Sequence, residues 1–305
     1  RLPTPPSPPL PDPPAPLTRN NAPMPIHAPV ALESTLLLHG VPREQGATLA
    51  RELAQIVRAR GAVPRIVGVH SGRPILGLSD AQLDDLLAAP RVEKINTASL
   101  GIAIHRRGHG ATTVSATMQL AAENGVRLFA TGGLGGVHAN YHQRLDISAD
   151  LAAFTRFPVA VVTSGCKSIL DVINTREVLE TLGVPVVGFR TDRFPAFYLR
   201  DGGIGVDARF DDPADLAAYL RAELARTSRG IVVANPIPAE HELAQADWDR
   251  WLAAARAQTP SAVGRDVTPA VLAALHQLSG GRTLAANLAL VKANADLAGQ
   301  LAVAM

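Results

Sequence analysis

The chain contains a single cysteine, few aromatic residues and no long hydrophobic run. Only Cys166 carries a thiol, which excludes an intrachain disulfide and a cysteine-rich zinc site and favours a reducing, cytoplasmic setting. No continuous apolar run reaches the roughly 18 residues of a membrane-spanning helix, so we expect no membrane partner. Basic residues are scattered rather than clustered, so we expect no nucleic-acid partner either.

The rest of the composition is typical of a globular enzyme. Hydrophobic residues make up 47% of the 305 residues and charged residues 18%, with a formal net charge of +2. Such a chain is long and apolar enough to bury a large core. Because aromatic residues account for only 4% while alanine is abundant, we expect a core built from Ala, Val and Leu.

The first 24 residues differ from the rest. Nine prolines lie between Pro3 and Pro16, with almost nothing apolar to bury. This composition favours polyproline II or disorder. We therefore predict a proline-rich, disordered tail over residues 1–24 and a single domain over residues 25–305.

Strand-like and helix-like segments alternate after this tail. Ser79 with Gln82 predicts a capping box, and Asp212 before Pro213 predicts a helix N-cap. The alternation predicts an α/β fold: an α-β-α sandwich with a largely parallel central sheet and a mostly helical C-terminal segment. We expect strands at 65–69, 126–130, 158–162, 185–189 and 230–234, and helices at 43–61, 112–124 and over most of the chain after 241.

Lys167 is the most informative residue. It follows the apolar run 157–162, which is typical of a buried parallel strand, and a helix is expected to open near Ile169. Ligands of open α/β sheets bind outside the carboxyl ends of the strands, where a buried amine can lose its proton and attack a carbonyl carbon. The alternative is a surface lysine that happens to follow a strand.

Glu33 interrupts another apolar run, Val30–Leu38, which we interpret as a strand. A carboxyl group there must be paired, hydrogen-bonded or protonated, because burial of an unpaired charge is costly. Burial that raises its pKa suits a general acid. A structural salt bridge is the alternative interpretation.

Several polar segments are open to two interpretations each. The glycine-rich loop Thr131–Gly136 offers backbone N–H groups for a phosphate, or is a plain turn. Thr112 and Thr113 precede a helix and are interpreted as a cap rather than an anion site. Lys94 supplies a charge to a phosphate or is a solvated surface residue.

Acidic residues after the glycine-rich loop suggest a cation site. His138, His142 and Asp146 are spaced by four, but the preceding glycines favour a loop, so we do not interpret this spacing as a helical metal motif. Asp146 and Asp150, with Ser148 between them, suit a hard cation such as Mg²⁺ or Mn²⁺. The same pattern fits an N-cap with a first-turn acid.

Taken together, these segments resemble the pseudouridine-5′-phosphate glycosidase family, also called indigoidine synthase A-like. The similarity runs in order and with matching spacing from about Val30 to about Ala295. The segments that carry it are 31–35, 110–114, 131–138, 146–151, 167–171, 183–188, 194–198, 232–238 and 284–287, with Asn294.

The resemblance implies an enzyme that reversibly cleaves the C–C glycosidic bond of pseudouridine 5′-phosphate to uracil and ribose 5-phosphate. Lys167 would form a covalent imine with the sugar, and Glu33 would donate and accept protons. Asp146 would hold a divalent metal ion, typically Mn²⁺, largely through waters. A homotrimer is also implied.

The resemblance further implies a set of substrate contacts. Those expected around the phosphate and ribose are Lys94, Val114, Ser148, Ala149 and Asp150; Thr131 is included among the binding residues, and His138 and Asn287 are expected near the uracil. One departure is Ala98-Ser99, where the family often has Arg-Asp.

The alternative functions are another sugar-phosphate lyase with a Schiff-base lysine, or a non-catalytic nucleotide or sugar-phosphate binding protein.

Overall fold

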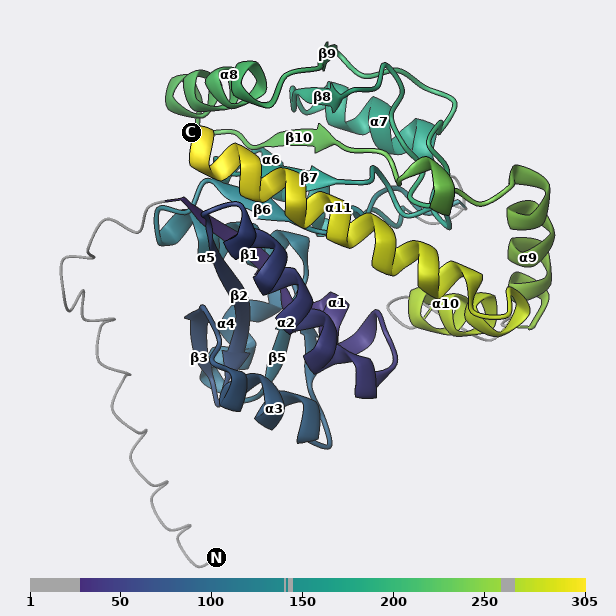
Figure 1. The fold of residues 1–305 in the computed structure, drawn as a ribbon. Coiled ribbons are helices and arrows are strands. Elements are labelled where there is room, and N and C mark those ends of the chain that lie inside the picture. The colour runs from purple at the N-terminus through teal and green to yellow at the C-terminus, as the bar shows by residue number, and fades with distance from the viewer. Residues whose placement is uncertain (1–27, 140, 142–144, 259–266) are drawn as a thin grey trace, which may run out of the picture.

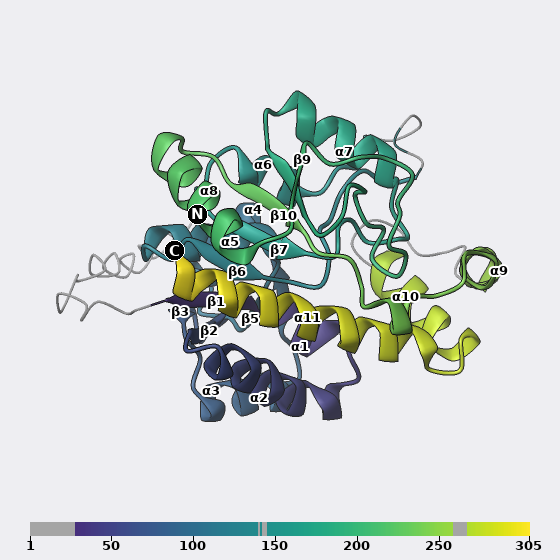
Figure 2. The same cartoon turned by 45° about the horizontal axis from the view of Figure 1, so that its top comes forward.

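The protein is represented by a computed structural model that describes residues 28–139, 141, 145–258 and 267–305. The predicted disordered tail, residues 1–24, lies outside these described residues. Residues 25–27 of the expected domain lie outside them as well. In the described part, ten strands form one sheet with helices on both of its faces (Figures 1 and 2). The predicted α-β-α arrangement is confirmed.

The sheet is largely parallel, as predicted. Its order is β4-β5-β2-β1-β6-β7-β10-β8-β9, and β3 pairs with β2 outside this order. Only the β2–β3 and β2–β5 pairs are antiparallel among the pairings of the described strands. The strands are β1 Pro29–Glu33, β2 Val63–His70, β3 Arg73–Leu76, β4 Glu93–Ile95, β5 Gly110–Thr112, β6 Leu128–Ala130, β7 Ala160–Thr163, β8 Val186–Phe189, β9 Ala208–Phe210 and β10 Ile231–Ala234.

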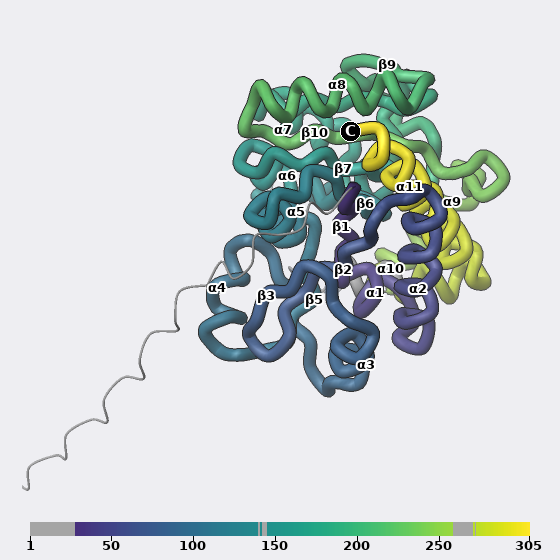
Figure 3. Tube along the Cα trace, turned by 60° about the vertical axis from the view of Figure 1, so that its left-hand side comes forward, coloured from purple at the N-terminus to yellow at the C-terminus, as the bar shows by residue number. Residues whose placement is uncertain are grey.

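The helices form two layers, and the C-terminal segment is mostly helical, as expected. The long α11 packs on α2 and α8 over one face, while α5 and α6 pack together over the other (Figures 1 and 3). The helices are α1 Ser34–His39, α2 Arg43–Ala59, α3 Asp80–Ala88, α4 Thr97–His105, α5 Val114–Glu123, α6 Ala149–Phe154, α7 Val172–Thr181, α8 Pro213–Arg226, α9 Gln245–Gln258, α10 Val267–Leu278 and α11 Arg282–Ala304.

Both predicted helix starts are confirmed. The Ser79 side chain accepts a hydrogen bond from the backbone of Gln82, and the Gln82 side chain accepts one from the backbone of Ser79. The Asp212 carboxylate accepts hydrogen bonds from two backbone N–H groups at the start of α8, with Pro213 at its first position. In each case the side chain satisfies N–H groups that have no partner within the helix.

Three expected boundaries were wrong. The run Val30–Leu38 is not one strand, because β1 ends at Glu33 and α1 begins at Ser34. Thr112 belongs to β5, so α5 begins at Val114 rather than at Thr112. The helix after Lys167 begins at Val172, because the Asp171 side chain caps it by accepting a hydrogen bond from the backbone of Asn174.

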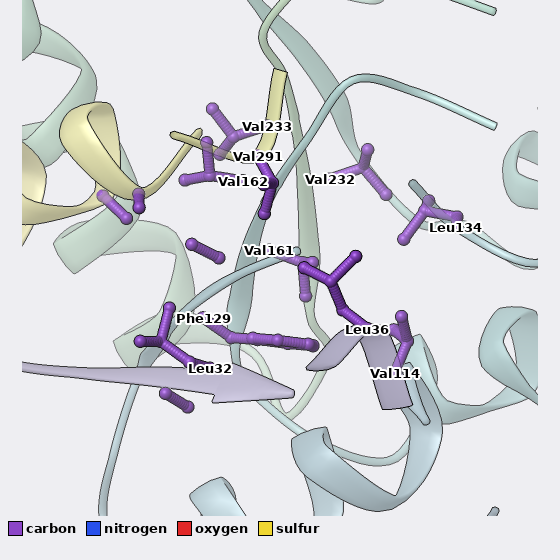
Figure 4. Packing of buried hydrophobic residues seen from close by; sticks show 14 of the residues in the cluster. Leu32, Leu36, Val114, Phe129, Leu134, Val161, Val162, Val232, Val233 and Val291 are labelled. Atoms are coloured by element: carbon purple, nitrogen blue, oxygen red, sulfur yellow. The ribbon is translucent and has the colours of Figure 1, made fainter. Parts of the chain in front are cut away.

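The core lies between the sheet and its helices and is built mainly from Ala, Val and Leu, as the composition predicted. Leu32, Phe129 and Val161 on neighbouring strands are almost fully buried, and Val291 of α11 packs near Val162 (Figure 4). This packing holds the central strands in one register, so the position at which each strand ends is fixed. No helix in the described ranges is long and apolar enough to cross a membrane.

The register brings three chain segments to the same edge of the sheet. Leu32 of β1 is level with Ala130 of β6, which is level with Val162 of β7. The following residues therefore leave the sheet side by side: Glu33 from β1, Thr131 from β6 and the loop that carries Lys167 from β7. The site is built on these strand ends.

Candidate active site

The Glu33 carboxyl group is buried at the end of β1, with 7% of the residue exposed. The Thr131 hydroxyl donates a hydrogen bond to one of its oxygens. Burial raises the pKa of Glu33 above its usual value, while the positive charge of Lys167 and the hydrogen bond from Thr131 oppose that rise. A buried carboxyl whose pKa is raised suits the general acid that the sequence predicted.

The loop with Lys167 is fastened to the loop that follows β6. The backbone N–H of Leu134 donates to the Gly165 carbonyl at 2.9 Å, and that of Lys167 donates to the Leu134 carbonyl at 3.1 Å. Gly165 has a φ of +75°, and an added Cβ would lie 1.8 Å from the Pro195 carbonyl oxygen. Only glycine fits this turn, which directs Lys167 toward the same space as Glu33.

Two cavities meet at these side chains. One has a volume of about 560 Å³ and the other about 380 Å³, and Glu33, Thr35, Lys94 and Lys167 line both. Lys167 is half-buried at their junction. An amine and a carboxyl group at this junction can therefore act on a molecule that occupies both cavities.

The larger cavity is mostly apolar. Its walls include the end of α1, the segment 91–94, Ile169, Phe197 and Tyr198, and it contains the predicted residue Asn287 from α11. Asn287 is buried, and its Nδ2 donates to the Gly40 carbonyl at 3.3 Å, whereas its Oδ1 has no hydrogen-bond partner. The Asn287 Oδ1 atom can therefore accept a hydrogen bond from a planar polar ligand in this apolar cavity.

The smaller cavity collects most of the other predicted site residues. These are Lys94, Val114, His138, Asp146, Ser148, Ala149 and Asp150. Thr131 lies apart from them, since it is fully buried behind Glu33 and contacts its carboxyl group. The structure thus brings together residues that are more than 130 positions apart in the sequence, such as Glu33 and Lys167.

Asp150 has a structural partner for each carboxylate oxygen. Oδ1 accepts a hydrogen bond from Ser115 N at 3.0 Å, and Oδ2 accepts one from Gly135 N at 2.9 Å. Asp150 therefore caps α5, a role that the sequence assigned to the threonine pair. That assignment was wrong: Thr113 makes no capping hydrogen bond with its side chain, and the Thr112 hydroxyl donates to the Val67 carbonyl at 2.8 Å.

The glycine-rich loop is used mainly for internal bonding. The N–H groups of Leu134, Gly135, Val137 and His138 all donate to acceptors within the protein. An added Cβ on Gly135 would lie 2.3 Å from the Ser148 hydroxyl oxygen, so close packing requires glycine there. These observations favour a packed turn over a phosphate cradle for this part of the loop.

Asp146 places a partly exposed carboxylate on the wall of the smaller cavity. Its side chain is 43% exposed beside the smaller cavity, and one of its oxygens lies 3.9 Å from His138 Nδ1. Among the described residues no group of three His, Cys, Asp or Glu side chains could hold a metal ion; His142 lies outside them. A single exposed carboxylate fits a hard cation that keeps several waters, and does not fit a closed protein site.

Sequence comparison gives the family. The family model described as indigoidine synthase A like protein matches residues 21–304. The chain belongs to this family. It is 50% identical over 279 residues to the pseudouridine-5′-phosphate glycosidase of Methylobacterium nodulans, covering 90% of this chain and 83% of that protein. It is 48% identical to the enzyme of the same name from Salinispora tropica, covering 90% and 86%.

Two solved structures have the same fold. An indigoidine synthase A-like protein from Thermotoga maritima superposes with a TM-score of 0.85 and 35% identity, covering 91% of this chain and 92% of that one. A prealnumycin C-glycosynthase, solved in complex with ribulose 5-phosphate, gives a TM-score of 0.82 with 35% identity and 90% coverage of both chains.

Sequence reasoning included Phe197 and Tyr198 only within the matching segment 194–198 and gave neither of them a role in the site. Both line the larger cavity and both are nearly fully buried. Phe197 has a φ of +59°, which is rare for a bulky residue and is typical of functional sites. The scarcity of aromatic residues was the available signal, because two adjacent aromatics are unusual in a chain with seven Phe and three Tyr.

The raised pKa of Glu33 predicts a pH-dependent gain in stability on its replacement. Above the usual value of 4.5 the unfolded chain releases this proton while the folded protein retains it, so Glu33 destabilises the fold as pH rises. We expect Glu33→Gln to raise the melting temperature by a few degrees near neutral pH and to leave it unchanged near pH 4. Scanning fluorimetry at both pH values tests this, and an equal gain at both would contradict it.

Proposed function

We propose that the protein reversibly cleaves the C–C glycosidic bond of pseudouridine 5′-phosphate, giving uracil and ribose 5-phosphate. The observation that carries this proposal is the meeting of Lys167 and Glu33 at the junction of two cavities of different character. The relatives named pseudouridine-5′-phosphate glycosidase, at 48–50% identity over 90% of the chain, support the same reaction.

The two cavities suit the two halves of this substrate. The apolar cavity with Asn287 is suited to the uracil ring, since it combines apolar walls with an unsatisfied amide oxygen. The smaller cavity, with Lys94 on its walls, is suited to the ribose and phosphate. His138 lines this cavity and not the apolar one, so the contact with uracil expected for it is not part of this arrangement. The bond to be broken then lies beside Lys167 and Glu33.

The proposed reaction proceeds through a covalent intermediate. Glu33 gives its proton to O4′ as the C1′–O4′ bond breaks and the lone pair of uracil N1 forms a C5=C1′ double bond. The uncharged Lys167 amine then adds to C1′, which restores the C5=C6 double bond, and the proton released from its nitrogen returns to Glu33. Glu33 then protonates the uracil carbon as the C1′–C5 bond breaks, and the nitrogen lone pair forms an imine with C1′. Water hydrolyses this imine to ribose 5-phosphate and the free amine. A lysine is needed because the leaving atom is carbon, for which a carboxylate pair alone does not suffice.

A second candidate is C–C bond formation or cleavage on another pentose 5-phosphate. The C-glycosynthase with bound ribulose 5-phosphate, 35% identical to this chain, favours it. Such a lyase would need Lys167 and the smaller cavity, but no uracil contact in the larger one. Uracil release therefore distinguishes the two.

Uracil release from pseudouridine 5′-phosphate is the direct test. We expect uracil from the wild type and none above background from Lys167→Ala, measured by chromatography. Glu33→Gln should lower kcat by about 10²–10⁴-fold, the usual contribution of general acid–base catalysis. Uracil from Lys167→Ala would remove the covalent step, and no uracil from folded wild type would overturn the proposed function.

We propose in addition that Asp146 binds a divalent metal ion, most simply Mn²⁺, largely through waters. When bound, the ion would supply positive charge near the phosphate and ribose. The side chains themselves orient the substrate: Lys94 attracts the phosphate, and Ser148 is available as a hydrogen-bonding hydroxyl on the same wall.

The metal proposal predicts a specific loss of affinity for Mn²⁺. Asp146→Asn should weaken Mn²⁺ binding, measured by calorimetry on the metal-free protein, by at least about tenfold. Asp171→Asn is the matched control, because Asp171 caps α7 and asparagine caps equally well. Equal affinity of wild type and Asp146→Asn would contradict the proposal.

We also propose a homotrimer. Leu145 is 81% exposed and Ile147 38% exposed, next to the smaller cavity, which is unusual for large apolar side chains and fits a contact with a second copy. Light scattering should give three times the mass of one chain. Leu145→Asp should lower that mass, and a monomeric wild type would contradict the proposal.

A further inference from the structure

Asn294 joins the ends of three adjacent parallel strands. It lies on α11 and is completely buried. Its Nδ2 donates to the Thr131 carbonyl at 2.8 Å and to the Ser164 hydroxyl at 3.1 Å, and its Oδ1 accepts from Asn235 Nδ2 at 2.9 Å. These partners are the residues directly after β6, β7 and β10, which are neighbours in the sheet.

Two of these partners, Thr131 and Ser164, are connected to Glu33 and Lys167, the two groups that would react. Thr131 donates its hydroxyl hydrogen to Glu33, so the position of the Thr131 backbone sets the position of this donor. Ser164 begins the short loop that ends at Lys167, and its own N–H donates to the Gly132 carbonyl at 2.9 Å. The side chain of Asn294 thus contacts both loops at the points where they leave the sheet.

Packing alone does not require an amide at this position. A buried amide is tolerated only when its polar atoms are paired, and an apolar side chain of similar volume would carry no such requirement. The neighbouring Leu290 and Val291 already supply the apolar contact between α11 and the core. The hydrogen bonds of Asn294 therefore have a use beyond filling space.

We propose that Asn294 is a positioning residue that fixes the Lys167 loop relative to the Glu33–Thr131 pair. This inference rests on the proposed function, because it concerns the alignment of the two groups that would react. Misplacement of a reacting group by about 1 Å costs about a hundredfold in rate. Binding of substrate in the outer parts of the two cavities does not depend on that alignment.

The test is a steady-state comparison of Asn294→Leu and Asn294→Asp with wild type on pseudouridine 5′-phosphate. Both substitutions remove the donor to the Thr131 carbonyl, and Asn294→Asp keeps the shape if Asn294→Leu fails to fold. We expect kcat to fall about a hundredfold while KM changes by less than about threefold. Unchanged kcat in a folded variant would overturn the proposal.

Leu297→Ala is the matched control. Leu297 lies on the same helix, is 3% exposed and belongs to the hydrophobic core, so its truncation destabilises the protein by loss of packing. We expect a lower melting temperature with kcat within about twofold of wild type. A fall in kcat equal to that of Asn294→Leu would reduce Asn294 to a structural role and overturn the proposal.

A double-mutant cycle tests the route through Thr131. If Asn294 acts partly by holding Thr131, the fold reduction in kcat of the double variant Thr131→Val/Asn294→Leu should be smaller than the product of the fold reductions of the two single variants. Independent, multiplying effects would show that Thr131 is not on the route and would overturn this part of the proposal.

A second readout separates this proposal from the proposed function. Borohydride trapping of ribose 5-phosphate on Lys167, followed by mass spectrometry, needs the aligned lysine but no glycosidase activity. If the wild type forms the adduct but releases no uracil, the proposed function fails. The positioning role of Asn294 would still be supported if Asn294→Asp formed the adduct about tenfold more slowly than the wild type. Equal trapping rates would overturn that role, and no adduct in the wild type would overturn both proposals.

Discussion

Burial of the Glu33 carboxyl group at the end of β1 is the constraint on which the site depends. The group has little access to water, so its charged form is disfavoured, and the Thr131 hydroxyl is held against it by the end of β6. That contact exists only because Leu32 and Ala130 are level in the sheet. A shift of register by one residue would turn Glu33 to the other face and separate it from Lys167.

The rest of the fold maintains this arrangement. Asp150 holds the start of α5 and the glycine-rich loop together with its two oxygens, and Asn294 ties the ends of β6, β7 and β10. Both are buried polar groups whose atoms are paired, and buried polar groups that are fully hydrogen-bonded rigidify a site. The destabilising burial of the Glu33 carboxyl group is thus offset by a polar network around it, a distribution of stability that is common in active sites.

The sequence predicted the strand–helix alternation and both helix caps, and it pointed to Glu33 and Lys167 beside strand ends, because these features depend on local pattern. It could not predict that β5 runs antiparallel to β2, since Gly110–Thr112 is too short to show a strand pattern. It also assigned the capping of α5 to the adjacent threonines, because the carboxylate of Asp150 approaches that helix from 35 residues away. The role of Asn294 likewise depends on contacts more than 50 residues apart.

The central claim is that burial raises the pKa of Glu33 beside Lys167, so that this carboxyl group keeps its proton to a higher pH than a free glutamate does. Infrared difference spectra of the wild type minus Glu33→Gln, recorded across the pH range, measure this proton directly. The account predicts that the band of a protonated carboxyl group persists above the usual pKa of 4.5 and is lost only at higher pH. Loss of that band near 4.5 would contradict the account, because Glu33 would then be ionised when the reaction requires an acid.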